Sequence, residues 1–387
     1  MERILTIESL AFGGEGVGRA DGKVIFVPQT APGDEVRVKI LSDHGKYERA
    51  EVLEVVRKSP DRVDPECSVF GHCGGCQWQH VSYDAQLHWK QEILAGTLRR
   101  VGRIQDPKIL PIIAASNPWN YRRRIQLKVD HQGRIGFYGQ KSHDVVEFDQ
   151  CRIADNLLNE KLLQIRGDAE APEVGFELSL NGSSVVHVLE ERNGEAIFSQ
   201  VNPQQNDHLI KTALDFAFGN ADKAFTKKKS VVELYAGAGN FSFPLAERAG
   251  KITCVEENAE AVRIAEEAAE SRHLDHMTWV QGSAEWGLKK IYRNRETQNS
   301  IDVLVLDPPR RGAKEILDLV CVIRPRVIVY VSCDPVTLAR DLNLLVRRHY
   351  VLDQVQPVDM FPQTYHIESV SRLTLRSESS LVESGGD

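Results

Sequence analysis

The 387-residue sequence contains no apolar run of 18 residues and no segment that resembles a signal peptide. Membrane-spanning helices and secretory leaders depend on such segments, so we expect a cytoplasmic protein with no membrane partner. Positive charge is also in deficit, since 48 Lys and Arg stand against 55 Asp and Glu. The chain as a whole therefore lacks the charge signature of a nucleic-acid-binding protein, although a local basic patch would suffice for phosphate contact.

Cysteine is present in a small and odd number, seven. In a reducing compartment such a set indicates thiol chemistry or metal binding rather than disulfides. The length and a hydrophobic content of 42% allow two or three domains, each with its own core. The sequence indicates no obligate protein partner, and a monomer is the default expectation.

The first 57 residues contain short runs of strand-forming residues separated by turn residues. These runs lie at 3–10, 22–29, 34–41 and 48–56, and a loop at 13–22 holds Gly13, Gly14, Gly16 and Gly18. The spacing predicts a small five-stranded β-barrel of the oligonucleotide-binding kind. With its glycine-rich loop the segment resembles a TRAM domain, a small RNA-binding barrel. A barrel used only for packing would have the same pattern.

Three cysteines, Cys67, Cys73 and Cys76, follow a linker rich in Pro and Asp, and Cys151 comes much later. Three thiolates on a glycine-rich loop and one distant thiolate form a four-sulfur set suited to a [4Fe–4S] cluster or a tetrahedral zinc ion. The two glycines between Cys73 and Cys76 let the backbone wrap a bulky centre, which favours the cluster. Because four sulfur ligands leave no open coordination site, we interpret the centre as structural.

The region around these cysteines combines a predicted helix at 82–102 with positive charge. Alternating residues predict antiparallel strands at 120–130, 133–140 and 144–149. Eleven Lys or Arg and five Asp or Glu lie between Arg99 and Arg152, with Tyr121, Phe137 and Tyr138 among them. A basic strip with interleaved aromatic rings fits RNA phosphate contact and base stacking, and a solvated sheet face fits equally well.

The C-terminal half alternates strands and helices, which is typical of an α/β fold with a parallel sheet. A strand at 231–234 leads into the turn 236–240, and the next strand ends at Glu256. Glycines in the turn let a ligand approach the backbone, and Glu256 is placed to accept hydrogen bonds from both ribose hydroxyls. The turn has G-x-G without a third glycine or a P-loop lysine, which favours S-adenosyl-L-methionine over a dinucleotide or triphosphate.

One thiol, Cys333, stands where an apolar strand at 327–331 turns into a helix that has Pro335 in its first turn. In open α/β sheets, ligands bind at such strand ends. A helix N-terminus and its backbone N–H groups lower the pKa of a thiol placed before them, so we expect a reactive thiolate. Taken alone, a free cysteine is more often a small buried hydrophobic residue. The other motifs of the chain, taken together with Cys333, reverse that expectation.

Taken together, these motifs resemble the RNA uracil-5-methyltransferase family, and within it the ribosomal-RNA branch that carries a TRAM domain and an iron–sulfur cluster. The resemblance runs from the first barrel to Arg372, on the segments CSVFGHCGGCQW, FSQVNPQQN, ELYAGAGNFSFPLA, VLDPPRRG, YVSCDPVTLARD and DMFPQTYHIESV. It implies a Rossmann-like class I methyltransferase domain that uses S-adenosyl-L-methionine. It also implies RNA as substrate, with 23S rRNA favoured and tRNA left open by cluster-containing archaeal relatives.

The resemblance also implies roles for individual residues. Cys333 matches the nucleophile, Glu368 matches the base, and Phe198 matches a position near the target base. The positions that match donor contacts are Gln200, Tyr235, Asn240, Glu256, Ser283 and Asp307. The positions that match cluster ligands are Cys67, Cys73, Cys76 and Cys151.

The chemistry of uracil explains why a thiol and a carboxylate are needed together. Carbon 5 of uracil is a poor nucleophile, and addition of a thiolate to carbon 6 makes an enolate whose carbon 5 can attack the donor methyl group. A base must then remove the proton from carbon 5 before the sulfur can leave, and a partly dehydrated Glu368 would have a raised pKa that suits this step. Without the adjacent motif, we would interpret Glu368 as a surface carboxylate beside a β-strand.

The expected architecture is an α/β methyltransferase fold with two further domains. We expect a barrel at 1–57, a central α+β iron–sulfur domain at 58–200, a methyltransferase domain at 201–376 and a disordered tail at 377–387. An amino-methylating enzyme is disfavoured because Arg310 stands where an aromatic residue would follow the two prolines. Arg310 and Arg311 fit RNA phosphate contact or a plain surface role. An RNA-binding assembly factor with an inactive fold is the rival, and the presence of both Cys333 and Glu368 opposes it.

Overall fold

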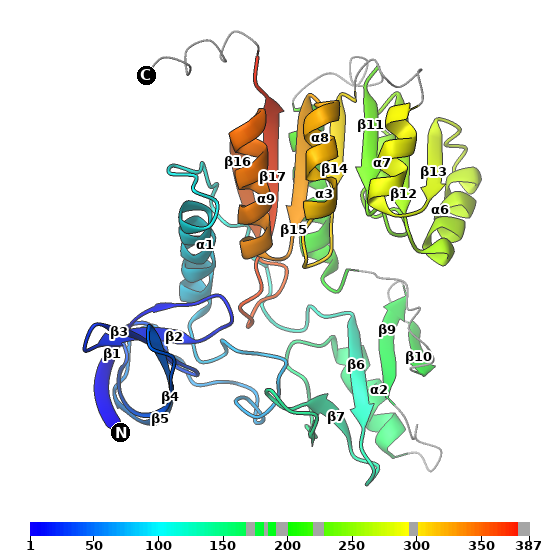
Figure 1. Ribbon diagram of the computed structural model, residues 1–387. Helices are drawn as coiled ribbons and strands as arrows, with labels where there is room; N and C mark the ends of the chain where they lie inside the picture. The colour runs from blue at the N-terminus through cyan, green and yellow to red at the C-terminus, as the bar shows by residue number, and fades with distance from the viewer. Residues whose placement is uncertain (168–174, 182–184, 191–199, 220–227, 294–300, 378–387) are drawn as a thin grey trace, which may run out of the picture.

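A computed structural model describes residues 1–167, 175–181, 185–190, 200–219, 228–293 and 301–377. Three sheets divide these residues into a closed barrel, a five-stranded sheet and a seven-stranded sheet. Figure 1 shows the barrel and the five-stranded sheet side by side below the seven-stranded sheet. The predicted tail lies outside the described residues apart from Ser377.

The N-terminal barrel closes in the strand order β1-β2-β3-β5-β4. Its strands are β1 (Glu2–Leu10), β2 (Gly16–Ala20), β3 (Lys23–Val27), β4 (Glu35–Asp43) and β5 (Tyr47–Arg57). The five-stranded barrel is confirmed, but the glycine-rich segment was wrongly predicted to be a loop throughout, since β2 lies within it. A Cβ atom on Gly16 or Gly18 would come within 2.0 Å of the Thr30 hydroxyl or 2.1 Å of the Leu5 side chain. Glycine is therefore needed here for close packing inside a strand.

The carboxylate of Asp34 ties the barrel to the linker that follows it. Asp34 is fully buried, and the guanidinium of Arg62 donates to its Oδ2 atom at 2.6 Å. The backbone N–H groups of Ala31 and Ser59 donate to the same carboxylate at 2.6 and 2.9 Å. Burial opposes ionisation, but these donors outweigh it and hold the pKa of Asp34 below its usual value.

The central region begins with helix α1 (Tyr83–Arg100) and continues into the five-stranded sheet. The sheet has the order β10-β9-β6-β7-β8, and neighbouring strands run antiparallel, as expected for the segments at 120–149. Its elements are β6 (Arg124–Val129), β7 (Ile135–Tyr138), β8 (Val145–Val146), α2 (Asn156–Arg166), β9 (Phe176–Asn181) and β10 (Val185–Glu190). Leu127, Leu158 and Phe176 belong to a core that this region forms for itself.

The C-terminal half forms the seven-stranded sheet, in the order β13-β12-β11-β14-β15-β17-β16. Its strands are β11 (Ser230–Leu234), β12 (Lys251–Glu256), β13 (Met277–Gln281), β14 (Val303–Leu306), β15 (Val327–Ser332), β16 (Tyr350–Val358) and β17 (Glu368–Leu375). The first five run parallel, whereas β17 runs antiparallel to both β15 and β16. The α/β fold expected from the sequence is confirmed.

Helices cover both faces of this sheet. They are α3 (Pro203–Phe218), α5 (Ser242–Ala246), α6 (Ala259–Ser271), α7 (Ala284–Arg293), the 3-10 helix η2 (Lys314–Ile316), α8 (Leu317–Ile323) and α9 (Pro335–Arg348). Figure 1 shows α7, α8 and α9 in front of the strands and α3 behind them. Helix α3 begins at Pro203, because Asn202 caps it and Pro203 occupies its first turn.

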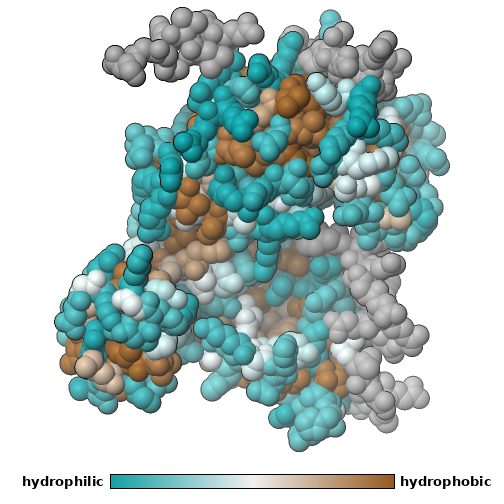
Figure 2. Space-filling view, in the orientation of Figure 1, coloured by the Kyte–Doolittle hydropathy of each residue, from teal (hydrophilic) through white to brown (hydrophobic). Residues whose placement is uncertain are grey.

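Within the described residues, no helix combines the length and apolar character that crossing a membrane requires. Figure 2 shows a mainly hydrophilic face in which the hydrophobic side chains form separate patches. This agrees with the absence of long apolar runs in the sequence.

We predict that Asp34→Ala lowers the free energy of unfolding by about 3 kcal/mol at pH 7, because it leaves the mostly buried Arg62 without its counter-charge. The pKa of Asp34 is lowered in the folded state, so its contribution is present above the usual pKa of an aspartate. That contribution is lost as the pH falls through the lowered value.

Urea denaturation of both proteins at pH 7 and at acid pH measures this difference. Glu54→Ala is the matched control, because it breaks the exposed Arg37–Glu54 pair of the same barrel and should change the free energy of unfolding by less than about 1 kcal/mol. Equal effects of the two substitutions at pH 7 would contradict the prediction.

Candidate active site

A large pocket opens at the carboxyl ends of the parallel strands of the seven-stranded sheet. Its volume is about 1340 Å³, above the ~300–1,000 Å³ of a usual single-ligand site. All eight residues predicted for donor binding and catalysis line it: Gln200, Tyr235, Asn240, Glu256, Ser283, Asp307, Cys333 and Glu368. The described structure therefore brings together residues that the sequence scatters over 169 positions, with room for a donor and a nucleotide side by side.

The glycine turn after β11 forms one wall of the pocket. Gly237 and Gly239 have φ angles of 55° and 98°, and a Cβ on Gly239 would lie 2.5 Å from the ring of Phe243. The backbone N–H of Gly237 donates to Glu256 Oε2 at 2.8 Å. Asn258 donates its backbone N–H to the other carboxylate oxygen, also at 2.8 Å. The turn thus holds the Glu256 carboxylate at the pocket edge.

Cys333 and Glu368 meet because of the register between β15 and β17. Ser332, the last residue of β15, pairs with Ser369 in the antiparallel ladder. Cys333 follows Ser332 and Glu368 precedes Ser369, so the thiol and the carboxyl are neighbours across the two strands. Glu368 is 5% exposed, whereas Cys333 is half-buried and lines the pocket.

The expectation of a thiol with a lowered pKa was wrong. The pKa of Cys333 is raised to about 12, chiefly by burial and in addition by the carboxyl groups of Glu368 and Asp307, while Arg310 opposes the shift. The N–H groups at the start of α9 do not stabilise a thiolate, because two of them already donate to the side chain of Asp334. These are the N–H groups of Val336 and Thr337, each at 2.9 Å. In this structure Cys333 is therefore a neutral thiol at pH 7.

The two carboxyl groups beside the thiol are also perturbed. Burial raises the pKa of Glu368 well above its ordinary value, and the Asp307 carboxyl adds to this shift. Burial likewise raises the pKa of Asp307 to about 7. The raised pKa expected for Glu368 is confirmed in direction.

Several pocket residues were missed in the sequence, and two of them lie close to Glu368 along the chain. Phe361 and His366 line the pocket beside Glu368. Burial lowers the pKa of His366 to about 4, so its imidazole is neutral at pH 7. Both lie in the segment DMFPQTYHIESV, from which only the glutamate was selected. Phe198, predicted near the target base, lies outside the described residues.

Two of the three aromatic residues predicted to stack on RNA bases make contacts within the protein. Tyr121 is buried, and its hydroxyl donates to the carbonyl of Pro362 at 3.1 Å. Phe137 stacks on Phe148 with ring centroids 4.8 Å apart. Only Tyr138 of the three is exposed, at 40%. Burial contradicts base stacking by Tyr121, whereas stacking by the partly buried Phe137 stays a prediction.

The four predicted metal ligands lie around one small cavity of about 50 Å³ in the central region. Cys67, Cys73, Cys76 and Cys151 line it as free thiols, together with Arg122. Burial raises the pKa of Cys73 to about 11 and that of Cys76 to about 12, and the neighbouring cysteines contribute to both shifts. Among the described residues, no group of three or more His, Cys, Asp or Glu has the arrangement of a metal-ion site.

Comparison with known proteins identifies the family. The family model for tRNA (uracil-5-)-methyltransferases matches residues 174–376, which is more than half of the chain, and the TRAM domain model matches residues 2–53. An uncharacterized RNA methyltransferase of Bdellovibrio bacteriovorus is 37% identical over 389 residues, covering 96% of this chain and 95% of that protein. One of Halalkalibacterium halodurans is 32% identical, with 96% and 97% covered.

The chain belongs to the RNA uracil-5-methyltransferase family. It is an RNA (uracil-5-)-methyltransferase by class, and its N-terminal barrel is a TRAM domain. The fold also resembles the tRNA (uracil-54, C5)-methyltransferase of Pyrococcus abyssi, solved with S-adenosyl-L-homocysteine. The TM-score is 0.70 at 23% identity, with 97% of this chain and 100% of that chain covered.

We predict that alkylation of Cys333 by iodoacetamide in this methyltransferase becomes about tenfold faster per pH unit between pH 7 and 9. The reason is that the thiolate fraction of a group with a pKa near 12 rises tenfold per unit throughout this range. Mass spectrometry of the peptide that contains Cys333 measures the rate. A plateau beginning near pH 7 would instead indicate a thiol activated by the helix N-terminus.

Proposed function

We propose that this methyltransferase transfers the methyl group of S-adenosyl-L-methionine to carbon 5 of a uridine in 23S rRNA through a covalent adduct with Cys333. The observation that carries the proposal is the adjacency of the Cys333 thiol and the Glu368 carboxyl across β15 and β17, at the edge of a pocket large enough for two ligands.

The donor is assigned to the side of the pocket formed by the glycine turn. Glu256 binds the ribose hydroxyls, Ser283 contacts the adenine, and Gln200, Tyr235, Asn240 and Asp307 hold the rest of the molecule. The positions of all six residues in the pocket lining support this assignment. The family relationship and the S-adenosyl-L-homocysteine bound to the Pyrococcus enzyme support the choice of donor.

The reaction begins when Cys333 Sγ bonds to carbon 6 of the uracil. The thiol proton passes to solvent or to the Asp307 carboxylate, whose pKa of about 7 suits an acceptor at neutral pH. The electrons of the carbon 5–carbon 6 double bond move towards the carbonyl at carbon 4, which gives an enolate. Carbon 5 then attacks the methyl group, and S-adenosyl-L-homocysteine leaves.

Glu368 completes the reaction as the base. It removes the proton from carbon 5, the electron pair of that bond restores the carbon 5–carbon 6 double bond, and the bond between carbon 6 and sulfur breaks. Cys333 departs as the leaving group, and the product is 5-methyluridine. The raised pKa of Glu368 makes its carboxylate a stronger base than an exposed glutamate.

The substrate assignment rests on the combination of a TRAM domain with four cysteines around one cavity. This combination matches the ribosomal-RNA branch of the family, which favours 23S rRNA. A tRNA uridine is the second candidate, because the family model is named for tRNA and the Pyrococcus relative acts on uracil 54 of tRNA. In either RNA the uridine must be single-stranded or flipped out to reach Cys333.

We favour a [4Fe–4S] cluster over a single zinc ion as the occupant of the cysteine cavity. Its volume of about 50 Å³ exceeds the ~10–15 Å³ that one water-sized particle needs. Val69, Phe70 and Phe148 keep it apolar, and Arg122 and Arg152 supply positive charge beside the thiols. A cluster bound by Cys67, Cys73, Cys76 and Cys151 would supply a structural cross-link with no open coordination site.

The domain division expected from the sequence is part of the proposal. The cores of the barrel and of the five-stranded sheet are separate, which supports domains at 1–57 and 58–200 before the methyltransferase domain at 201–376. All seven cysteines, which lie within the described residues, are free thiols, and this supports a reducing cytoplasm as the compartment. We propose a monomer.

The covalent step predicts that the protein, incubated with S-adenosyl-L-methionine and 5-fluorouridine-substituted 23S rRNA, forms an adduct that survives a denaturing gel. Fluorine replaces the proton that Glu368 must remove, so the sulfur cannot leave. Cys333→Ala should form no adduct and make no 5-methyluridine. Cys321→Ala, which alters another free thiol on α8, should behave as the wild type.

Mass mapping of 5-methyluridine in 23S rRNA and tRNA from a deletion strain decides between the two substrates. Loss of the modification from tRNA alone would transfer the proposal to tRNA. RNA binding without methyl transfer to either RNA would favour the assembly factor instead.

The cysteine centre predicts a brown protein with absorbance near 400 nm after anaerobic purification. Cys151→Ser should lose this absorbance, whereas Cys321→Ser should retain it. A colourless wild-type protein that contains one zinc ion would contradict the cluster.

A further inference from the structure

The hairpin loop at 359–367 shapes the part of the pocket next to Glu368. It connects β16 to β17, and Val358 pairs with Glu368 at its base. Phe361 and His366 project from it into the pocket lining. The base proposed for proton removal is therefore the first residue after this loop, so the conformation of the loop fixes where the carboxyl lies.

Four successive carbonyl groups of the loop accept hydrogen bonds from residues before α3. Met360 O accepts from Asn202 Nδ2 at 3.2 Å, and Phe361 O accepts from Lys90 Nζ at 2.9 Å. Pro362 O accepts from the Tyr121 hydroxyl at 3.1 Å. Gln363 O accepts from the backbone N–H groups of Gln77 and Trp78, at 3.1 and 3.0 Å. The loop is thus held mainly by the central region, including the two residues that follow Cys76.

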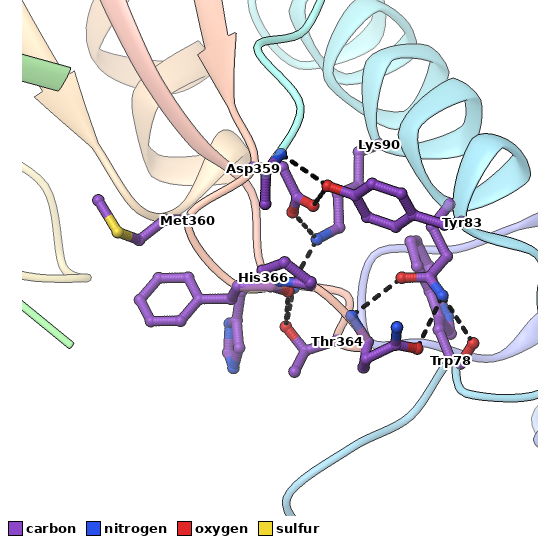
Figure 3. A network of polar contacts seen from close by, with 12 residues as sticks. Trp78, Tyr83, Lys90, Asp359, Met360, Thr364 and His366 are labelled. Carbon is purple, nitrogen blue, oxygen red and sulfur yellow. Dashed lines mark hydrogen bonds and ion pairs between the residues drawn. The ribbon is translucent and has the colours of Figure 1, made fainter. Parts of the chain in front are cut away.

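An ion pair without any exposed surface fixes the start of the loop. Lys90 Nζ lies 2.5 Å from Asp359 Oδ1, and both side chains are 0% exposed. The hydroxyl of Tyr83 donates to the other carboxylate oxygen at 2.7 Å. Figure 3 shows Lys90 and Tyr83 reaching Asp359 from α1. Such a pair adds little stability over apolar side chains of the same size, but it fixes direction and distance.

The middle of the loop carries backbone strain. Gln363 has a φ angle of 67°, in the left-handed region that non-glycine residues rarely occupy. Its backbone N–H donates to Gln86 Oε1 at 2.9 Å, and Gln86 Nε2 donates to Gln363 Oε1 at 3.0 Å. Strain of this kind persists only where the surroundings enforce it, and it concentrates at functional sites.

We propose that Lys90 and Gln86 of helix α1 are positioning residues for proton abstraction, holding the 359–367 loop so that the Glu368 carboxyl faces carbon 5 of the methylated uracil. This inference rests on the function proposed above and assigns part of it to the central region. The pocket for the target base is then completed by two regions of the chain.

The proposal separates the last chemical step from the earlier ones. Cys333 lies between β15 and α9, and of the proposed donor-binding residues Glu256 ends β12 and Ser283 follows β13. None of these four elements supplies a hydrogen bond or ion pair described above that holds the loop. Loosening the loop should therefore leave donor binding and sulfur addition in place, while removal of the proton from carbon 5 becomes slow.

The test compares Gln86→Met and Lys90→Met with the wild type on ordinary uridine RNA. Each variant should accumulate a methylated covalent adduct on denaturing gels, because the sulfur cannot leave until the proton is removed. We expect kcat to fall about tenfold to a hundredfold, in line with the effect of misplacing a reacting group by about 1 Å. The dissociation constant for S-adenosyl-L-homocysteine should stay within about twofold of the wild type.

Tyr350→Phe is the matched control, because it removes a buried hydrogen bond from the far end of β16, between its hydroxyl and Pro325 O at 3.1 Å. It should keep the wild-type kcat and accumulate no adduct. If Lys90→Met does not fold, Gln86→Met decides alone, since it buries no unpaired charge. A Gln86→Met protein with wild-type kcat would overturn the inference, and so would a parallel loss of affinity for S-adenosyl-L-homocysteine. Absence of turnover in the wild type would instead refute the proposed function.

Discussion

The antiparallel pairing of β17 with β15 is the constraint on which the site depends. A purely parallel sheet gathers only the carboxyl ends of its strands at one edge. Because β17 runs the other way, its first residue, Glu368, arrives at the edge where Cys333 leaves β15. Two groups with opposite tasks in the proposed reaction, bond formation and proton removal, thereby lie side by side.

The same adjacency sets the electrostatics of the pocket. Burial and the neighbouring carboxyl groups keep Cys333 protonated, and burial raises the pKa of both Glu368 and Asp307. A positively charged methyl donor bound in the pocket would lower the pKa of Cys333 again, since a nearby cation stabilises a thiolate. A site that becomes reactive only with its donor in place avoids unproductive thiol chemistry.

The central region connects two features that look independent in the sequence. Cys76 belongs to the cysteine cavity, and the next two residues, Gln77 and Trp78, donate to the loop that leads to Glu368. Damage at the cavity would therefore be transmitted to the pocket through backbone hydrogen bonds. The cysteine cavity is thereby linked to the pocket by a short run of backbone hydrogen bonds.

The sequence alone determined the barrel, the α/β fold, the glycine turn and the residues at each strand end, because these follow from local periodicity and turn chemistry. It misplaced β2, since glycines that favour a loop here serve close packing in a strand. It also assigned the wrong direction to the pKa of Cys333. Tertiary structure decided that pKa, because burial and carboxyl groups from distant segments outweigh the helix N-terminus, which Asp334 already occupies. Tertiary structure also decided the ion pair between Lys90 and Asp359, which are 269 residues apart in the sequence. Contacts at such a separation are set by packing and leave no local sequence pattern.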